Sequence, residues 1–196
     1  MLELCFATNN ENKLREIRRM LGSLFKILSL EDIHCDAGDL PENGVTLEEN
    51  SLEKASFVYN NYGVSCFADD TGLEVGSLDG EPGVFSARYA GPQKNSSDNI
   101  LLLLDRLKNS ANRNARFRTV ITLFLSGTPV QFEGIVNGII SKEKKGTQGF
   151  GYDPVFIPEG YDRSFAEMSL REKNKISHRG IAFRKLVEYL QLNIMD

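Results

Sequence analysis

The sequence predicts an α/β fold built on a mixed sheet. In the first third of the chain, short apolar runs alternate with segments whose apolar residues recur at helical spacing. That alternation is typical of strands connected by helices. Further on, two runs with apolar residues at every second position flank Gly127-Thr128, as in an antiparallel hairpin. With 196 residues, 41% of them hydrophobic, the chain can bury a sizeable core.

The first elements follow from the apolar periodicity. Residues 2–8 and 24–30 are predicted to be short strands, and residues 11–22 between them a helix. Residues 31–45 contain Asp, Gly, Pro and Asn and are predicted to form a loop.

A second helix is predicted over residues 46–63. Thr46 and Glu49 have the spacing of a capping box, and Gly63 can end the helix. The short apolar run at 64–68 is the next strand, and we expect it to end at Asp69 and Asp70 before a Thr-Gly turn.

The remaining elements are expected in the second half of the chain. In order, they are a glycine-rich loop (72–92), a helix (96–109), the hairpin strands (117–127 and 129–141), a Gly/Pro loop (146–158), a short helix capped by Ser169 and Glu172, and a final amphipathic helix through residues 183–190.

Composition excludes several classes of protein. The 27 acidic and 23 basic residues leave a net charge of -4, which gives no general attraction to nucleic acid or to an anionic membrane. No segment has the length of a membrane-spanning helix, and the N-terminus does not resemble a signal peptide. Neither the three cysteines nor the two histidines have the spacing of a zinc or redox site. We therefore expect a reduced, soluble, cytoplasmic protein.

One stretch could suggest a nucleic-acid binder. Residues 106–119 hold five basic residues and no acidic one. They include a single aromatic residue and belong to an acidic protein, so a solvated helix end and loop is the favoured interpretation.

The turn after the first strand is a candidate phosphate site. Backbone amides at a helix N-terminus bind phosphate, and Thr8, Asn9 and Asn10 can add side-chain donors. Lys13 lies in the first helical turn, where a cation is unfavourable against the helix dipole unless an anion compensates it. The alternative is an Asn-capped helix with a solvated lysine.

The acidic pair Asp69-Asp70 is a second candidate. Adjacent carboxylates repel, so a cation or a shared proton should stabilise them. A carboxylate at the carboxyl end of a strand can hold magnesium or deprotonate water. Glu42 and Lys54 could reach the same edge of the sheet. The alternatives are a turn capped by one aspartate and a solvated helix face.

Two later stretches could bind a nucleotide base. In "GTQGFGYDP" (146–154), three glycines surround two aromatic residues, so backbone and a ring face could approach a flat ligand. In "EKNKISHRG" (172–180), a donor-rich cluster suits a phosphate or a carbonyl-bearing base; its members are Lys173, Lys175, His178 and Arg179. The alternatives are a turn with core aromatics and a basic exposed loop.

Six stretches together resemble the Ham1 family of inosine triphosphate pyrophosphatases. They are "FATNNENKLREI", "TLEENSLEKA", "FADDTGLEV", "PGVFSARYAG", "GFGYDPVF" and "ISHRG". The similarity extends over nearly the whole chain, and six motifs at compatible spacing are specific. In this chain "DDT" replaces the frequent "DDS", which keeps the hydroxyl group.

The resemblance implies one domain of two lobes over residues 1–196, with an elongated mixed sheet flanked by helices and a nucleotide cleft between the lobes. It also implies a homodimer that hydrolyses ITP, dITP and XTP to the monophosphate and pyrophosphate with Mg²⁺. The nearest alternative function is that of a Maf-like nucleotide pyrophosphatase, but the stretches "SHRG" and "GFGYDP" argue against it. A nucleotide-binding module without turnover is disfavoured by the lysines and Asp70.

The resemblance also implies roles for individual residues. Asp70 would orient the attacking water or hold Mg²⁺, Lys13 and Lys54 would support catalysis, and Glu42 matches a metal-ligand position. The triphosphate would be held by Thr8, Asn9, Asn10, Glu11, Asn12 and Lys13. Thr71 would touch the substrate, and the base and sugar would be surrounded by Phe150, Gly151, Tyr152, Asp153, Lys173, His178 and Arg179.

Overall fold

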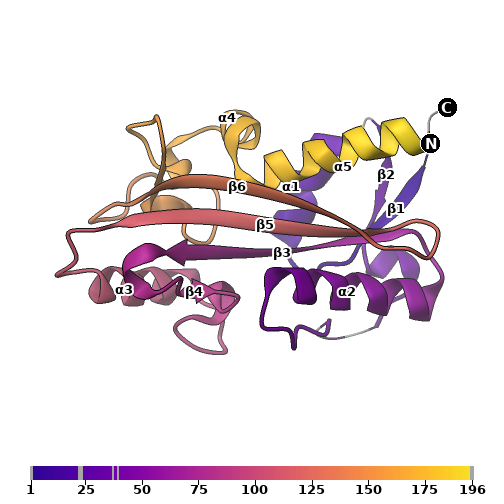
Figure 1. Ribbon diagram of the computed structural model, residues 1–196, viewed down its shortest axis with the longest axis horizontal. Coiled ribbons are helices and arrows are strands. Elements are labelled where there is room, and N and C mark those ends of the chain that lie inside the picture. The colour runs from indigo at the N-terminus through magenta and orange to yellow at the C-terminus, as the bar shows by residue number, and fades with distance from the viewer. Residues whose placement is uncertain (1, 22–23, 37, 39, 195–196) are drawn as a thin grey trace. The chain divides into compact units, whose positions relative to one another are not determined.

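The computed structural model describes residues 2–21, 24–36, 38 and 40–194. Contacts divide the chain into two compact units. Unit 1 comprises Met1–Asp70, Val120–Phe132 and Lys185–Asp196, and unit 2 comprises Thr71–Thr119 and Glu133–Arg184. Within the described residues, seven strands form one mixed sheet in the order β2-β1-β3-β5-β6-β7, with β4 paired to β3 (Figure 1). The predicted α/β class with a mixed sheet flanked by helices is confirmed.

Unit 1 begins with the predicted alternation of strands and helices. Its elements are β1 (Glu3–Phe6), α1 (Glu11–Leu21), β2 (Lys26–Leu28), the short 3-10 helix η1 (Glu31–Ile33), α2 (Leu47–Tyr62) and the first half of β3 (Cys66–Val75). Strand β1 pairs in parallel with both β2 and β3. The helix predicted at 11–22 is confirmed to residue 21, and Gly22 lies outside the described residues.

Strand alternation separates two apolar layers in unit 1. Cys5 and Cys66 are opposite each other in the register of β1 and β3, and both pack in a cluster with Val58 of α2. The next pair, Phe6 and Phe67, points to the other face by the two-residue period of a strand, and their rings stack with centroids 4.7 Å apart. Figure 1 shows α1 and α2 on opposite faces of these strands. Burial raises the pKa of both thiols to about 12, as expected for cysteines in a core.

The capping box of α2 is confirmed. The hydroxyl of Thr46 accepts a hydrogen bond from the backbone N–H of Glu49, and the carboxylate of Glu49 accepts one from the N–H of Thr46. Gly63 ends the helix in the left-handed conformation, with φ 65°. These bonds position the helix that carries Lys54.

Unit 2 consists of shorter elements around a long hairpin. They are the second half of β3, η2 (Gly76–Leu78), β4 (Pro82–Gly83), η3 (Ser86–Arg88), α3 (Ser96–Arg106), β5 (Asn114–Phe124), β6 (Val130–Ile140), η4 (Asp153–Val155), β7 (Phe156–Pro158), η5 (Phe165–Glu167), α4 (Leu170–Ile176) and α5 (His178–Ile194). The ends of β5 and α5 and the start of β6 belong to unit 1. The predicted hairpin and the capped helix after Ser169 are confirmed.

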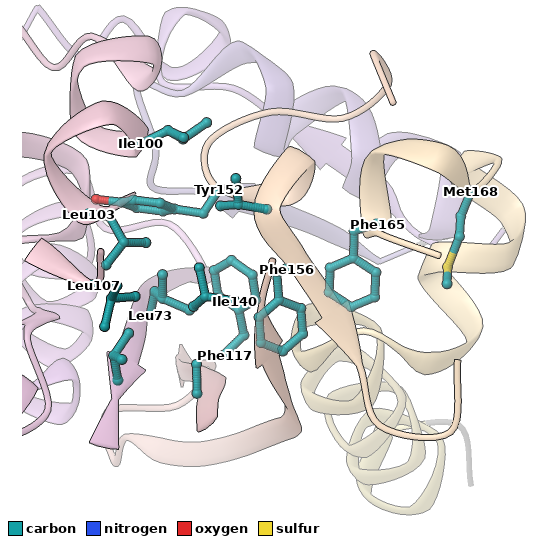
Figure 2. Packing of buried hydrophobic residues seen from close by; sticks show 13 residues of the cluster. Leu73, Ile100, Leu103, Leu107, Phe117, Ile140, Tyr152, Phe156, Phe165 and Met168 are labelled. Atoms are coloured by element: carbon teal, nitrogen blue, oxygen red, sulfur yellow. The ribbon is translucent and has the colours of Figure 1, made fainter. Parts of the chain in front are cut away.

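The core of unit 2 lies on one face of its strands. Leu73 of β3 and Phe117 of β5 pack there with Leu103 of α3 and with Phe156 and Phe165 from the chain after the hairpin (Figure 2). The opposite face of the same strands carries charged side chains, because alternate residues point away from the core. Glu74 and Arg116 form an ion pair on that face, at 2.6 Å.

The predicted end of the third strand at residue 68 is wrong. Strand β3 continues through Asp69, Asp70, Thr71 and Gly72 to Val75, so these residues are extended and form no turn. The glycine serves a close approach of two strands: a Cβ at position 72 would lie 2.8 Å from the carbonyl oxygen of Gly83 in β4. Gly72, which suggests a turn in the sequence, is instead required where β3 pairs closely with β4.

The basic stretch 106–119 is partly strand, since β5 begins at Asn114. Its arginines contact other groups of unit 2. Arg106 pairs with Glu81, and the guanidinium of Arg113 donates to three backbone carbonyls, those of Leu107, Ile140 and Ser141. The expected solvated helix end and loop is therefore restricted to the residues before β5.

Among the residues that the structure describes, no helix combines the length and the apolar character that a bilayer crossing requires.

Candidate active site

The turn between β1 and α1 is an asparagine cap. The side-chain oxygen of Asn10 accepts hydrogen bonds from the backbone N–H groups of Asn12 and Lys13, at 3.0 and 3.2 Å. The hydroxyl of Thr8 accepts the N–H of Asn10, and the amide of Asn9 donates to the carbonyl of Gly38. The capped-helix alternative thus describes the turn itself. Two of the amides that could face a phosphate are bound to Asn10.

The side chains of this turn differ in exposure. Asn9, Asn10 and Glu11 are exposed, whereas Thr8 and Asn12 are partly buried. The amide oxygen of Asn12 accepts from Arg15 at 2.5 Å. The structure therefore brings the six predicted residues of the turn together at the start of α1, with exposed polar groups at its tip.

Lys13 is no solvated lysine. Its ammonium lies 2.8 Å from a carboxylate oxygen of Asp69 in β3, and the Asp69 side chain is fully buried. Asp69 is therefore the anion that compensates a cation in the first turn of α1.

Asp70 faces the other helix. One of its carboxylate oxygens accepts a hydrogen bond from the side-chain amide of Asn50, at 3.1 Å, and the other lies 3.5 Å from the ammonium of Lys54. Both partners belong to α2. Successive residues of a strand point to opposite faces, so the adjacent carboxylates of Asp69 and Asp70 diverge and each has its own lysine. The expected stabilisation by cations is confirmed.

Lys54 also binds Glu42. The ammonium lies 2.5 Å from a carboxylate oxygen of Glu42, and the lysine side chain is only 6% exposed. The interpretation of Lys54 as part of a solvated helix face is therefore wrong. Glu42 and Asp70, which are 28 positions apart in the sequence, meet at one buried ammonium group.

Burial and charge act in opposite directions on these groups. Burial raises the pKa of Asp70, and Glu42 adds to the rise, while Lys54 and Lys13 oppose it. Burial lowers the pKa of Lys54, but Asp70, Glu42 and Asp69 outweigh it, so that the pKa of Lys54 is raised. The ammonium group is therefore held in its charged form among three acids.

The donor set fits magnesium bound together with substrate. Among the described residues, no group of three or more His, Cys, Asp or Glu side chains could hold a metal by itself. Mg²⁺ is commonly bound through one or two carboxylates, with water and substrate phosphates completing its shell. Asp70 and Glu42, which meet at Lys54, supply two such carboxylates.

Thr71 follows Asp70 in β3. Its hydroxyl is hydrogen-bonded to the hydroxyl of Thr119 in β5, at 2.7 Å, and its side chain is partly buried. Thr119 is fully buried. A neighbouring strand thus fixes the rotamer of Thr71.

The two later candidate stretches meet in unit 2. The carboxylate of Asp153 binds the ammonium of Lys173 at 2.7 Å and accepts the backbone N–H of Phe150 at 2.9 Å. The side chains of Asp153 and Lys173 are 3% and 4% exposed. This buried ion pair connects the "GFGYD" loop to α4.

Phe150 lies under two cations. The ammonium of Lys173 is 5.0 Å from the centroid of its ring, and the guanidinium carbon of Arg179 is 5.4 Å from it. The ring of His178 stacks on Phe117 at 4.5 Å. Phe150 itself is partly exposed, so an aromatic face and charged donors lie together.

Lys173, His178 and Arg179 are buried, whereas Lys175 is exposed, so the alternative of a basic exposed loop is wrong for the first three. The chain bends between α4 and α5 at Ser177, whose hydroxyl accepts the backbone N–H of Gly180. The capping box of Ser169 and Glu172 starts α4, one turn before Lys173.

Tyr152 and Gly151 are placed differently from their neighbour Phe150. The ring of Tyr152 lies in the core of unit 2, and its hydroxyl donates to the carbonyl of Ser86, at 2.9 Å. Its side chain anchors the loop, as in the alternative of a turn with core aromatics. Gly151 has a φ of 61° and provides backbone only.

A separate hollow of about 720 Å³ lies on unit 2, at the ends of β3, β5 and β6. It is lined by Glu74, Arg116, Ile139 and Tyr161, among others, and by none of the predicted site residues. This hollow is therefore distinct from the predicted site.

Sequence reasoning left two residues without a role. The sequence patterns indicate Asp69 only as the neighbour of Asp70, and they do not indicate Asn50. A signal for Asn50 exists, because Asn50 and Lys54 are four positions apart and lie on the same face of α2 as Leu47 and Val58. Polar residues on a buried stripe require partners.

The sequence as a whole matches known proteins. Residues 4–189 match the model of the Ham1 family. A dITP/XTP pyrophosphatase of Christiangramia forsetii is 57% identical over 189 residues, which cover 96% of this chain and 99% of that protein. One of Porphyromonas gingivalis is 51% identical over 191 residues, covering 97% and 98%.

Solved structures resemble the fold over the same length. A HAM1 protein from Coxiella burnetii matches with a TM-score of 0.89 and 36% identity, covering 97% of this chain and 99% of that one. A nucleoside-triphosphatase, dITP/XTP pyrophosphatase, from Mycobacterium abscessus matches with a TM-score of 0.77 and 38% identity, covering 94% and 98%.

Proposed function

The chain belongs to the Ham1 family, and from this premise we propose that it hydrolyses dITP, ITP and XTP to the nucleoside monophosphate and pyrophosphate. The expectation of family membership is confirmed. Relatives that carry the name dITP/XTP pyrophosphatase match nearly the whole chain, which supports this activity over that of a Maf-like enzyme.

One observation carries the proposal. A buried lysine, Lys54, holds two carboxylates, Glu42 and Asp70, at one point, and Lys13 pairs with the residue next to Asp70. Such an arrangement supplies cations for phosphate oxygens and carboxylates for a metal and a water. A module that only binds nucleotides has no need of a buried carboxylate beside a phosphate site.

Asp70 is proposed to orient the water that attacks the α-phosphorus. Its carboxylate accepts hydrogen bonds, so it can hold a water in a fixed orientation. Lys13 and Lys54 would neutralise the charge that develops on the pyrophosphate leaving group. Mg²⁺, held by Asp70 and Glu42, would polarise the phosphoryl oxygens when bound. The exposed side chains of Asn9, Asn10 and Glu11, with Thr8 and Asn12, would line the triphosphate.

The cluster in unit 2 is proposed to recognise the base. Phe150 offers a ring face for stacking, and His178 and Arg179 offer donors toward the oxygen at position six of the purine. Adenine presents an amino donor at that position, so buried donors of the protein would lose their partner, at a cost of about 1–3 kcal/mol each. Asp153 and Lys173 would hold Phe150 in place. The remaining substrate contacts would come from Thr71, Gly151 and Tyr152. The selectivity for the base would then follow from hydrogen bonding.

The remaining expectations from the resemblance are part of the same proposal. We propose a homodimer, a location in the cytoplasm, a single two-lobed domain over residues 1–196 and no nucleic-acid partner. Sedimentation at several protein concentrations tests the homodimer directly, because a monomer mass at all concentrations would contradict it.

The activity is tested by its products. The protein is incubated with dITP, XTP, dGTP and ATP in the presence of Mg²⁺, and pyrophosphate, orthophosphate and nucleoside monophosphate are quantified. We expect pyrophosphate and monophosphate in equal amounts from dITP and XTP, and much slower release from dGTP and ATP. Equal rates on all four nucleotides, or release of orthophosphate alone, would contradict the proposal.

A further inference from the structure

We infer that Asn50 is a positioning residue that holds the two carboxylates of the active site, Asp70 and Glu42, in their places. The inference rests on the proposed function, because it assigns a role in that same site. Its physical basis is the hydrogen bonding of one buried amide group, which is 1% exposed and lies on α2 one turn before Lys54.

The amide of Asn50 has only one possible orientation. Its NH₂ group donates to a carboxylate oxygen of Asp70 at 3.1 Å, and its oxygen accepts the backbone N–H of Gly44 at 2.8 Å. A flipped amide would place an oxygen against a carboxylate and an NH₂ group against an N–H. Both contacts would then be repulsive, so the two partners fix the side chain.

The bond to Asp70 sets the rotation of that carboxylate. The oxygen bound by Asn50 is Oδ2, while Oδ1 faces the ammonium of Lys54 at 3.5 Å. A hydrogen bond to one oxygen stops the group from turning about its Cβ–Cγ bond. The other oxygen then stays directed at the cation and at the place proposed for water and metal.

The bond to Gly44 sets the position of Glu42. Residues 42–46 run along the start of α2, where each is bound by a side chain of the helix: Glu42 by Lys54, Asn43 by Glu53, Gly44 by Asn50, and Val45 and Thr46 by Glu49. Within this series, two residues also contact Asp70: Lys54 through its charge, at 3.5 Å, and Asn50 through a hydrogen bond of its neutral amide. Asn50 therefore connects the loop that carries one carboxylate to the strand that carries the other.

Gly44 itself supports the close fit of this loop. A Cβ at position 44 would lie 2.5 Å from the Cβ of Glu49 and 2.9 Å from the amide oxygen of Asn50. The first contact involves an atom next to the helix backbone, which cannot move aside. Gly44→Ala would thus separate the loop from Asn50 while the bond from Asn50 to Asp70 remains.

The first test variant is Asn50→Asp. It keeps the size of the side chain and the acceptor for Gly44, but it replaces the donor with an oxygen that faces the carboxylate of Asp70. We expect kcat for dITP to fall about tenfold to hundredfold, the range that a misplaced reacting group costs, with KM changed far less. Wild-type kcat in a folded Asn50→Asp protein would overturn the inference.

The second test separates the bond of Asn50 to the loop, at Gly44, from its bond to Asp70. Gly44→Ala should raise the Mg²⁺ concentration for half-maximal activity several-fold, with a smaller effect on kcat, because it displaces Glu42. Without metal or substrate, hydrogen exchange of the Gly44 amide measured by NMR should be slow in the wild-type protein and in Asn50→Asp, and fast in Asn50→Ser. Equal exchange rates of that amide in the wild type and in Asn50→Ser would contradict the role of Asn50 in holding the loop.

Ser51→Ala is the matched control. Ser51 is the next residue of α2, is fully buried, and binds the hydroxyl of Thr122 at 2.8 Å. Its removal should lower the melting temperature but leave kcat and the Mg²⁺ requirement unchanged. If Asn50→Asp changed melting temperature and kcat only as Ser51→Ala does, Asn50 would be merely structural and the inference would fail.

The outcomes separate the inference from the proposed function. If the wild-type protein releases no pyrophosphate from dITP, the proposed function fails, whereas normal release with unaffected Asn50 variants overturns only the role of Asn50. Should Asn50→Asp not fold, Asn50→Ser shortens the side chain and so withdraws the amide donor from Asp70 without adding charge. Wild-type kcat in a folded Asn50→Ser protein would likewise overturn the inference.

Discussion

Two adjacent aspartates in β3 have different partners. Asp69 faces α1 and binds Lys13, while Asp70 faces α2, where it binds Asn50 and lies near Lys54. The two-residue period of a strand explains how neighbouring carboxylates avoid each other: their side chains point to opposite faces, and each lies beside a lysine. A pattern of two acids at the end of an apolar run therefore marks two ion pairs on opposite faces of the sheet.

The first prediction concerns Lys13. Its replacement by alanine leaves the fully buried carboxylate of Asp69 without this cation, which typically costs about 3–5 kcal/mol for a buried pair. We expect Lys13→Ala to lose both turnover and stability, as measured by urea unfolding and pyrophosphate release.

The double variant Lys13→Ala/Asp69→Asn is the control for this prediction. It removes the buried charge together with its partner, so most of the stability should return while the turnover stays low. Loss of turnover with unchanged stability in Lys13→Ala would show that the pair with Asp69 contributes little.

At the scale of elements, α2 positions much of the candidate site in unit 1. The capping box starts the helix, Glu49, Asn50 and Glu53 bind the preceding loop, and Lys54 binds both carboxylates. Loss of the cap should therefore loosen the loop as well as the helix.

The second prediction concerns this cap. Thr46→Ala removes the acceptor for the N–H of Glu49 and should lower the free energy of unfolding by about 1 kcal/mol. Thr46→Ser keeps the hydroxyl and should stay close to the wild type. Chemical denaturation of the three proteins measures the difference, and equal stability of the alanine and serine variants would contradict the role of the hydroxyl.

Local patterns made α2 predictable from the sequence, whereas its long-range contacts could not be predicted. The two ends of the helix are indicated by Thr46, Glu49 and Gly63, because capping depends on residues within one turn of each end. The partner of Asn50 is 20 positions away in β3, and no periodicity indicates it. The same holds for Gly72, which looks like a turn residue until the approach of β4 is known.

In unit 2 the sequence indicated a cluster of donor residues but not the environment of these residues. Lys173, His178 and Arg179 were recognised as a donor cluster, yet a basic loop of that composition is usually exposed. Their burial depends on the ion pair of Lys173 with Asp153 and on the stacking of His178 against Phe117. Both partners come from other elements of the unit.

At the scale of the whole molecule, the two units are interleaved along the chain. Unit 1 is made of three segments and unit 2 of two. Strands β3, β5 and β6 and helix α5 each begin in one unit and end in the other. Neither unit is a continuous piece of chain, so neither is expected to fold alone.

The third prediction follows from this interleaving. Thermal unfolding should be a single cooperative transition, with equal calorimetric and van't Hoff enthalpies. Differential scanning calorimetry measures both enthalpies. Two separate transitions would show that the units are independent domains.

The proposed function requires that water attacks the α-phosphorus of a deaminated purine nucleoside triphosphate. Hydrolysis of dITP in ¹⁸O-labelled water, followed by mass spectrometry of the products, shows which phosphorus atom is attacked. We expect the label in the phosphate of dIMP and none in the pyrophosphate. Label in pyrophosphate or in orthophosphate would mean that another phosphorus atom is attacked, and would contradict the proposed function.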